Sequence, residues 1–170
     1  YGEEKKWDIS HIRKTAYHEA GHAFLCWHGG ETPSYLTIVA RGNHGGYMAH
    51  GDNESQGTYT KKMLLHRIRT ALGGRAAEQL TQNDICSGAS NDIERATEIA
   101  RAMITQYGMS KKFGLMGLES VESKYLDGRA VLNCSDNTAA DIDNEVMKLL
   151  KESYKEAKRL LKENRKLMDK

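Results

Sequence analysis

The sequence has 170 residues, 25 of them basic and 23 acidic, and a formal net charge of +2. The charges are well mixed and form no basic block, so nucleic acid is not an expected partner. This length allows one domain to bury a core without disulfides, and we expect a single domain over residues 1–170. Three cysteines with no C-x-x-C pair fit a reducing compartment or buried thiols.

Membrane-spanning or secreted proteins and P-loop nucleotide-binding proteins are two further classes that the sequence disfavours, because the patterns typical of them are missing. No apolar run approaches the roughly 20 residues that cross a bilayer, and no signal peptide is visible, so we expect this chain to be soluble. The sequence lacks a G-x-x-x-x-G-K-[ST] loop, so we do not expect ATP to bind in the P-loop manner. Because the chain starts at Tyr1 rather than methionine, it fits an excised part of a longer protein.

The first part of the chain predicts a helix followed by a β-hairpin. Helical periodicity covers about 8–28, and Gly29 and Gly30 end it. The β-branched stretch 34–40 predicts a strand, and a glycine-rich turn leads to a second strand at 47–50.

Two more helices are predicted in the middle of the chain. Apolar residues recur at helical spacing over about 61–80, and a loop follows over 81–90. In the third helix, Asn91 is the expected cap because Glu94, three residues on, completes a capping box; Gly108 ends this helix.

The last part of the chain divides into an irregular stretch and a long charged helix. Residues 109–137 are dotted with glycine and serine, and we expect them to be mostly irregular. From about Thr138 to the end, an apolar stripe recurs at helical spacing. The stripe contains Ile142, Val146, Leu149, Ala157 and Leu160. The whole pattern predicts a mainly α fold with a small β-hairpin and a long C-terminal helix.

The first helix contains the motif H-E-x-x-H at His18, Glu19 and His22. Histidines at i and i+4 lie one turn apart on the same face, where both imidazoles can reach one Zn²⁺. On a helical wheel this face lies opposite the apolar residues, which predicts that the apolar stripe packs inward. That stripe contains Ile9, Ile12, Ala16, Ala20, Ala23 and Trp27.

The motif also predicts a reaction. A catalytic zinc site takes three protein ligands and keeps a position for water, whose pKa the metal lowers towards 7. Glu19 is then placed to take the proton of that water and to deliver a proton to a leaving amine.

Two residues compete to be the third ligand. His28 completes a second zinc-protease spacing, but that class has glycine where Leu25 stands here, and a continuous helix would carry His28 away from the metal. Asp92 borders the apolar stripe of the third helix and is the better candidate. From the pattern alone, Asp92 could equally serve only to compensate the helix dipole.

Three stretches together resemble the peptidase domain of FtsH-type ATP-dependent zinc metalloproteases. They are Tyr17-His-Glu-Ala-Gly-His22, Leu72-Gly-Gly-Arg-Ala-Ala-Glu78 and Gly88-Ala-Ser-Asn-Asp-Ile-Glu-Arg-Ala-Thr97. The resemblance covers essentially the whole chain in order. It implies a mainly helical domain that binds one catalytic Zn²⁺ through His18, His22 and Asp92, with Glu19 as the catalytic base.

The resemblance also bears on substrate binding and on Glu78. The stretch Leu36, Thr37, Ile38, Val39 and Ala40 resembles the edge strand of the family, against which an extended polypeptide could pair.

Glu78 is the rival carboxylate on the second helix. It could orient a ligand histidine, or it could equally be a surface residue paired with an arginine.

We therefore expect a zinc-dependent endopeptidase that cleaves unfolded or misfolded polypeptides. The family pattern implies a parent protein with an AAA+ ATPase module and a membrane anchor, assembled as a hexamer, with this domain on the cytoplasmic or an equivalent reducing side. The alternative is a non-catalytic oligomerisation module that uses zinc only for stability. Glu19 argues against it, because a purely structural site has no use for a base beside the metal.

Overall fold

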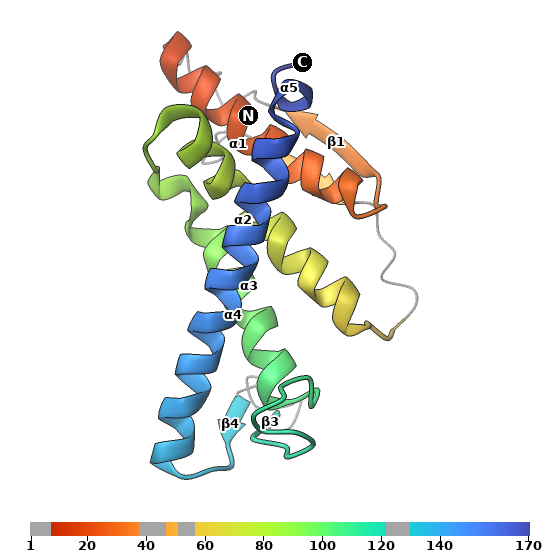
Figure 1. The fold of residues 1–170 in the computed structure, drawn as a ribbon, viewed down its shortest axis with the longest axis vertical. Helices are drawn as coiled ribbons and strands as arrows, with labels where there is room; N and C mark the ends of the chain where they lie inside the picture. The colour runs from red at the N-terminus through yellow and green to blue at the C-terminus, as the bar shows by residue number, and fades with distance from the viewer. Residues whose placement is uncertain (1–7, 38–46, 51–56, 122–129) are drawn as a thin grey trace, which may run out of the picture.

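A computed structural model describes residues 8–37, 47–50, 57–121 and 130–170, and it confirms the mainly α prediction. Figure 1 shows the long helix α4 along the long axis, with α1 crossing near one end and a small β-ladder at the other. Helix α2 packs against α1, α3 and α4. The helices are α1 (Ile9–His28), α2 (Lys61–Gln82), α3 (Ser90–Thr105), α4 (Asp136–Glu163) and α5 (Arg165–Met168).

Helix α1 has the predicted bounds but not the predicted buried face. The Asp8 side chain accepts a hydrogen bond from the His11 backbone N–H and caps the start, and Gly29 caps the end. Ile9 is 85% exposed and Trp27 is 60% exposed, so the apolar stripe does not pack inward as expected. The buried residues are instead Glu19, Gly21, His22, Phe24, Leu25 and Cys26.

A close glycine contact explains this orientation. A Cβ on Gly21 would lie 2.4 Å from the Gly73 carbonyl oxygen of α2 and 2.7 Å from the Ala77 Cβ. The two helix backbones therefore approach each other closely at Gly21 and Gly73. This approach turns the face that carries the histidines toward α2, although that face is the more polar one.

We expect Gly21→Ala to destabilise the protein by about 1–3 kcal/mol, because the added methyl group has no space between the two helices. Denaturant unfolding measures the effect. The matched control is Gly117→Ala, because nothing lies within 4 Å of a Cβ built on Gly117. Equal stability of the two variants would contradict the close approach of α1 and α2.

The predicted hairpin is confirmed within the described residues. Strand β1 (Pro33–Thr37) pairs antiparallel with β2 (Tyr47–His50), and Leu36 lies opposite Met48. Residues Ile38, Val39 and Ala40, which we expected to continue the first strand, lie outside the described residues.

The region around α3 departs from the expected bounds. Helix α2 continues to Gln82, and Asn83 ends it in the left-handed conformation, with φ of 52°. The predicted cap Asn91 is wrong, because the short 3-10 turn η2 (Ser87–Ala89) leads directly into α3 at Ser90. Helix α3 ends at Thr105, and Gly108 reverses the chain beyond it with φ of 62°.

The C-terminal region is more regular than expected. Within 109–137, strand β3 (Glu119–Val121) pairs antiparallel with β4 (Ala130–Leu132), a ladder too short to show a sequence period. Helix α4 begins at Asp136, capped by the Ser135 side chain. The predicted single helix to the end is interrupted at Asn164, and α5 begins at Arg165.

The buried core lies on both sides of α2. One cluster joins α2 to α3 and α4 through Ile68, Met103 and Ile142, and a second joins α1, α2 and α4 through Leu25, Ala77 and Ala157. Among the described residues, no helix has the length and apolar character that crossing a membrane requires.

Candidate metal centre

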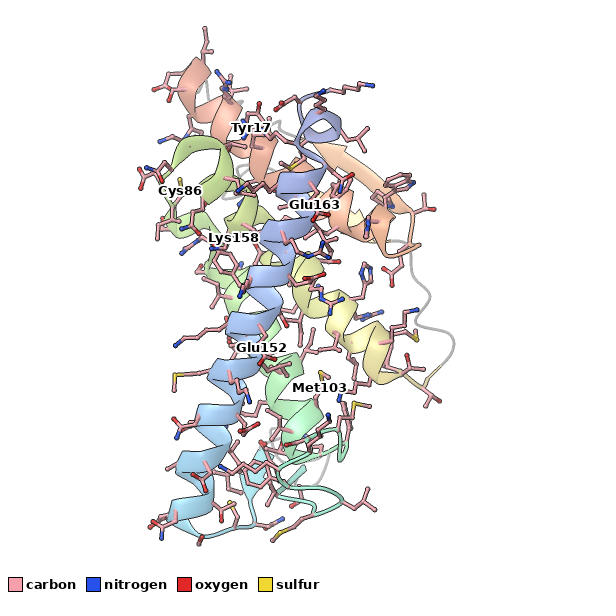
Figure 2. All side chains as sticks on the ribbon, viewed as in Figure 1. Tyr17, Cys86, Met103, Glu152, Lys158 and Glu163 are labelled. Carbon is pink, nitrogen blue, oxygen red and sulfur yellow. The ribbon has the colours of Figure 1, made fainter. Side chains whose placement is uncertain are left out.

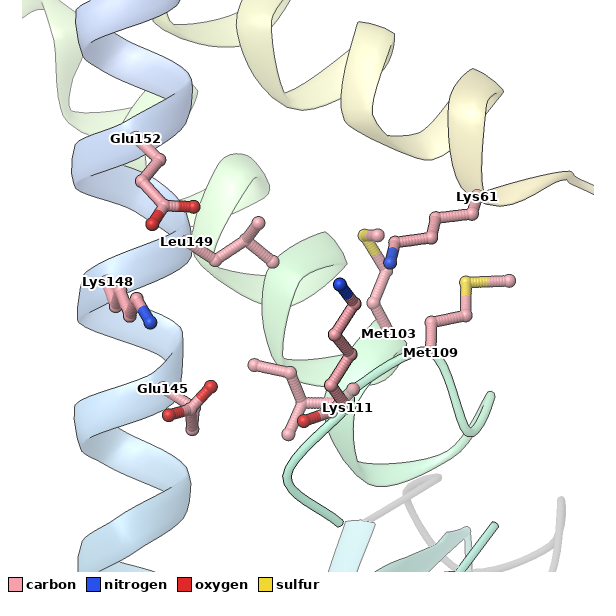
Figure 3. Close-up of a pocket in the computed structure, with 10 residues that line it drawn as sticks. Lys61, Met103, Met109, Lys111, Glu145, Lys148, Leu149 and Glu152 are labelled. Atoms are coloured by element: carbon pink, nitrogen blue, oxygen red, sulfur yellow. The ribbon is translucent and has the colours of Figure 1, made fainter. Parts of the chain in front are cut away.

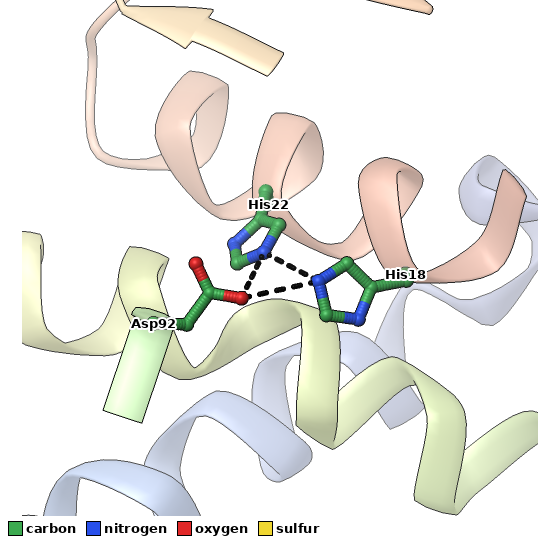
Figure 4. Close-up of side chains that lie close together, drawn as sticks. All are labelled: His18, His22 and Asp92. Atoms are coloured by element: carbon green, nitrogen blue, oxygen red, sulfur yellow. Dashed lines mark hydrogen bonds and ion pairs between the residues drawn. The ribbon is translucent and has the colours of Figure 1, made fainter. Parts of the chain in front are cut away.

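Three side chains from two helices converge at one point on the surface of α2. His18 and His22 project from α1 with their Nε2 atoms 3.0 Å apart. The Asp92 Oδ2 atom, from the first turn of α3, lies 3.1 Å from the His18 Nε2 and 3.2 Å from the His22 Nε2. Figure 4 shows both rings and the carboxylate turned toward the same point. Residues 74 positions apart in the sequence thus present three metal-ligand atoms together.

The opposite nitrogen of each imidazole is held by α2. The His22 Nδ1 donates to the Thr70 carbonyl oxygen at 2.6 Å, so this nitrogen carries the proton and a neutral ring offers its Nε2 lone pair to the shared point. The His18 Nδ1 lies 2.7 Å from Glu78 Oε1. Hydrogen bonds of this kind fix the ring orientation and tautomer of histidines that bind metals.

Glu78 is buried and has a second contact. Its Oε2 accepts a hydrogen bond from the Cys86 backbone N–H at 3.0 Å, and Arg75 Nε lies 3.9 Å from the same oxygen. Of the two sequence interpretations of Glu78, the structure therefore places it against His18 rather than on the surface.

The charges around His18 favour a cation at this point. Burial by itself lowers the pKa of His18, but hydrogen bonds to Asp92 and Glu78 and the charges of both outweigh it and raise the pKa to about 9. Burial by itself opposes ionisation of Asp92, yet the hydrogen bond from His18 and the positive charge of that ring hold the pKa of Asp92 well below its usual range.

The residues present fit a zinc ion. Two imidazole nitrogens and one carboxylate oxygen are a donor set that zinc accepts. Gly74 of α2 lies beneath the point of convergence, and a Cβ there would be 2.5 Å from the Nε2 atoms of both His18 and His22. The glycine therefore leaves space beside the two nitrogens. A zinc ion would need this space, because the usual Zn–N distance is about 2.0–2.1 Å.

Glu19 lies next to His18 on the buried side of α1, with 7% of its surface exposed. Its pKa is raised because burial disfavours the charged form, and the charges of His22 and His18 partly oppose this effect.

The rival ligand His28 is not brought to this point. It is the last residue of α1, exposed, and its ring lies 5.7 Å from the ring of Phe24, measured between centroids. Among the described residues, the group of histidine, cysteine and acidic side chains that converge as metal ligands consists of His18, His22 and Asp92.

A pocket of about 320 Å³ lies elsewhere, between the start of α2, the end of α3 and the middle of α4 (Figure 3). Its lining includes the apolar side chains of Met103 and Leu149 and the charged side chains of Lys61, Lys111, Lys148, Glu145 and Glu152. None of the residues that converge at the metal centre lines this pocket.

Sequence reasoning missed the parts of the site that the backbone supplies. The Thr70 carbonyl and the Cys86 N–H belong to residues of no particular type, and no motif marks them. The glycine pair in Leu72-Gly-Gly-Arg was quoted only as part of the resemblance, although Gly73 and Gly74 are what allow α1 and its histidines to approach α2.

The fold and the site together define a helical domain with a histidine, histidine and aspartate centre held between two helices. The profile of peptidase family M41 matches residues 7–170, and the chain belongs to this family. A Clostridium perfringens protein named "ATP-dependent zinc metalloprotease FtsH" is 45% identical over 157 residues, covering 91% of this chain and 22% of that protein.

Two further relatives carry the same kind of name. A Lancefieldella parvula "ATP-dependent zinc metalloprotease FtsH" is 43% identical over 153 residues, covering 88% of this chain and 24% of that protein. A Thermoanaerobacter "ATP-dependent zinc metalloprotease FtsH 1" is 44% identical over 154 residues, covering 88% and 25%. The resemblance noted in the sequence is thus confirmed, and the chain spans about a quarter of the length of these relatives.

Proposed function

We propose that residues 1–170 form the peptidase domain of a zinc-dependent endopeptidase that cleaves unfolded or misfolded polypeptides. The observation that carries this proposal is the convergence of His18, His22 and Asp92 within 3.2 Å of one another, with Glu19 buried beside them. In this proposal the three converging side chains hold one zinc ion.

Each residue of the site has a role in the proposed reaction. When bound, the zinc ion would act as a Lewis acid and would lower the pKa of a water molecule at the site towards 7. Glu19 accepts the proton of the attacking water and donates a proton to the leaving amine. Glu78 holds the His18 ring through Nδ1, and the Thr70 carbonyl holds the His22 ring in the same way, so that both Nε2 atoms stay directed at the metal.

The hairpin is the proposed site of substrate binding. Among the described residues, β1 pairs with β2 on one side only, which leaves its other edge for an extended polypeptide. We assign this role to Leu36 and Thr37, and to Ile38, Val39 and Ala40 after them. Binding through backbone hydrogen bonds explains a preference for unfolded chains, whose backbone groups are not already paired.

The remainder of the parent protein belongs to the same proposal. The relatives are named ATP-dependent. We therefore propose that the parent couples this domain to an AAA+ ATPase module that unfolds substrates. We further propose that the parent is membrane-anchored and assembles as a hexamer, with this domain on the cytoplasmic or an equivalent reducing side.

Metal removal tests the proposal. We expect the purified chain to contain about one zinc ion and to cleave casein, to lose the cleavage when a chelator removes the metal, and to regain it when zinc is restored. Metal analysis and a fluorescent casein assay provide the two measurements. A chain that binds zinc and changes its oligomeric state with zinc, but never cleaves casein, would favour the oligomerisation module instead.

A further inference from the structure

The backbone of one residue, Cys86, links the two sides of the metal centre. The Cys86 N–H donates to Glu78 Oε2 at 3.0 Å, and the Cys86 carbonyl oxygen accepts from Arg75 Nη2 at 3.0 Å. Cys86 lies in the loop between α2 and α3, where Figure 2 labels it. Both backbone hydrogen-bond groups of Cys86 are therefore bonded to side chains of α2, those of Arg75 and Glu78, which lie one turn apart on that helix.

The same loop leads directly to the third converging side chain. From Cys86 the chain enters the turn η2 and then α3, and Asp92 lies in the first turn of α3. The position of the Cys86 backbone determines where α3 begins, and so where the Asp92 carboxylate lies. The same link also reaches His18, because Glu78 contacts Cys86 with one carboxylate oxygen and His18 with the other.

Arg75 is suited to this task. The side chain is half-buried, and its Nε is a buried atom with no hydrogen-bond partner among the described residues, 3.9 Å from Glu78 Oε2. The guanidinium group thus lies near the Glu78 carboxylate while its Nη2 donates to the Cys86 carbonyl oxygen in the loop.

We propose that Arg75 is a positioning residue of the metal centre, which acts through the Cys86 backbone and Glu78 to hold the His18 ring and the start of α3 in register. This inference rests on the proposed function, because it assumes that His18, His22 and Asp92 bind zinc.

The test measures zinc binding by competition with a chromophoric chelator. We expect Arg75→Met to weaken zinc binding roughly tenfold, the lower end of the effect of removing partners that orient metal ligands. The visible absorption of Co²⁺ bound in place of zinc is expected to change as well, because it reports ligand geometry rather than stability. Arg75→Lys keeps the charge and loses the planar fork, and we expect it to weaken zinc binding too.

The control is Arg67→Met on the same helix. Arg67 is also half-buried and lies over the Tyr59 ring, so its loss is expected to affect stability without changing zinc affinity. In a Glu78→Gln background, Arg75→Met is expected to add little further loss, since the two residues act through one link.

The outcomes separate the two proposals. A wild-type chain that binds no zinc overturns both. Zinc binding by the wild type with unchanged affinity in Arg75→Met and Arg75→Lys overturns the positioning role alone. If Arg75→Met does not fold, Arg75→Lys decides the question. Additive losses in the Glu78→Gln background also overturn the role, because they show that Arg75 acts independently of Glu78.

Discussion

Replacing Glu19 with glutamine is expected to lower casein hydrolysis by about 10²–10⁴-fold and to leave the zinc content unchanged, because a positioned general base contributes that factor without binding the metal. Glutamine has nearly the same shape as glutamate and fits the same buried position, but its amide does not accept a proton from water. Steady-state cleavage of casein measures the first effect, and metal analysis of the same samples measures the second.

The matched control for this substitution is Glu94→Gln. Glu94 is exposed on α3, close in sequence to Asp92, so its replacement removes a charge near the site without touching the buried face of α1. We expect the activity of this control to stay at the wild-type level. Near-normal hydrolysis by Glu19→Gln would remove Glu19 from the mechanism, and loss of zinc would show that it holds the metal instead.

The second large effect is expected at Asp92. Asp92→Ala should lower zinc affinity by more than the 10–100-fold that removing an outer partner costs, because it deletes one of the three proposed direct ligands. Zinc should also stabilise the wild type against unfolding much more than it stabilises this variant, because a ligand stabilises only the state that binds it. Metal analysis and thermal unfolding with and without zinc test both expectations.

His28→Ala provides the comparison. His28 is exposed at the end of α1 and packs beside Phe24, away from the convergence of His18, His22 and Asp92. We expect its removal to leave zinc occupancy intact. The reverse pattern, in which His28→Ala loses zinc and Asp92→Ala keeps it, would overturn the proposed ligand set.

The proposed chemistry of this site could be predicted from neighbouring residues, because the motif on which it depends lies within one short stretch of the sequence. His18, Glu19 and His22 lie within five consecutive positions, and one turn of helix is enough to place both imidazoles on one face. The same is true of α1 as an element, since an aspartate cap and a glycine stop are signals carried by neighbouring residues.

Helix boundaries were less predictable where other signals compete. Asn91 and Glu94 have the spacing of a capping box, yet after the η2 turn α3 begins at Ser90, two residues earlier than a cap at Asn91 would place it. The interruption at Asn164 lies within a continuous helical pattern, and no proline or glycine marks it.

Which face of α1 is buried was decided only by the tertiary structure. Hydrophobic periodicity favoured the face with Ile9 and Trp27, but those residues are exposed and the polar face of the motif is buried. The reason is packing: Gly21 and Gly73 let the two helix backbones approach, and α2 then supplies Thr70 and Glu78 as partners for the histidines. Burial of polar groups becomes acceptable once each has a hydrogen-bond partner.

The sequence by itself therefore determined the helical class and the pair of histidines with their adjacent glutamate, because these depend on residues within a few turns of one another. It left Asp92 and Glu78 as candidates with equally good ordinary explanations. Only the tertiary structure placed their carboxylates against His18, since contacts across 60 and 74 positions depend on how α1, α2 and α3 pack. The Cys86 backbone and Gly74 complete the site through backbone position and open space, which no residue pattern records.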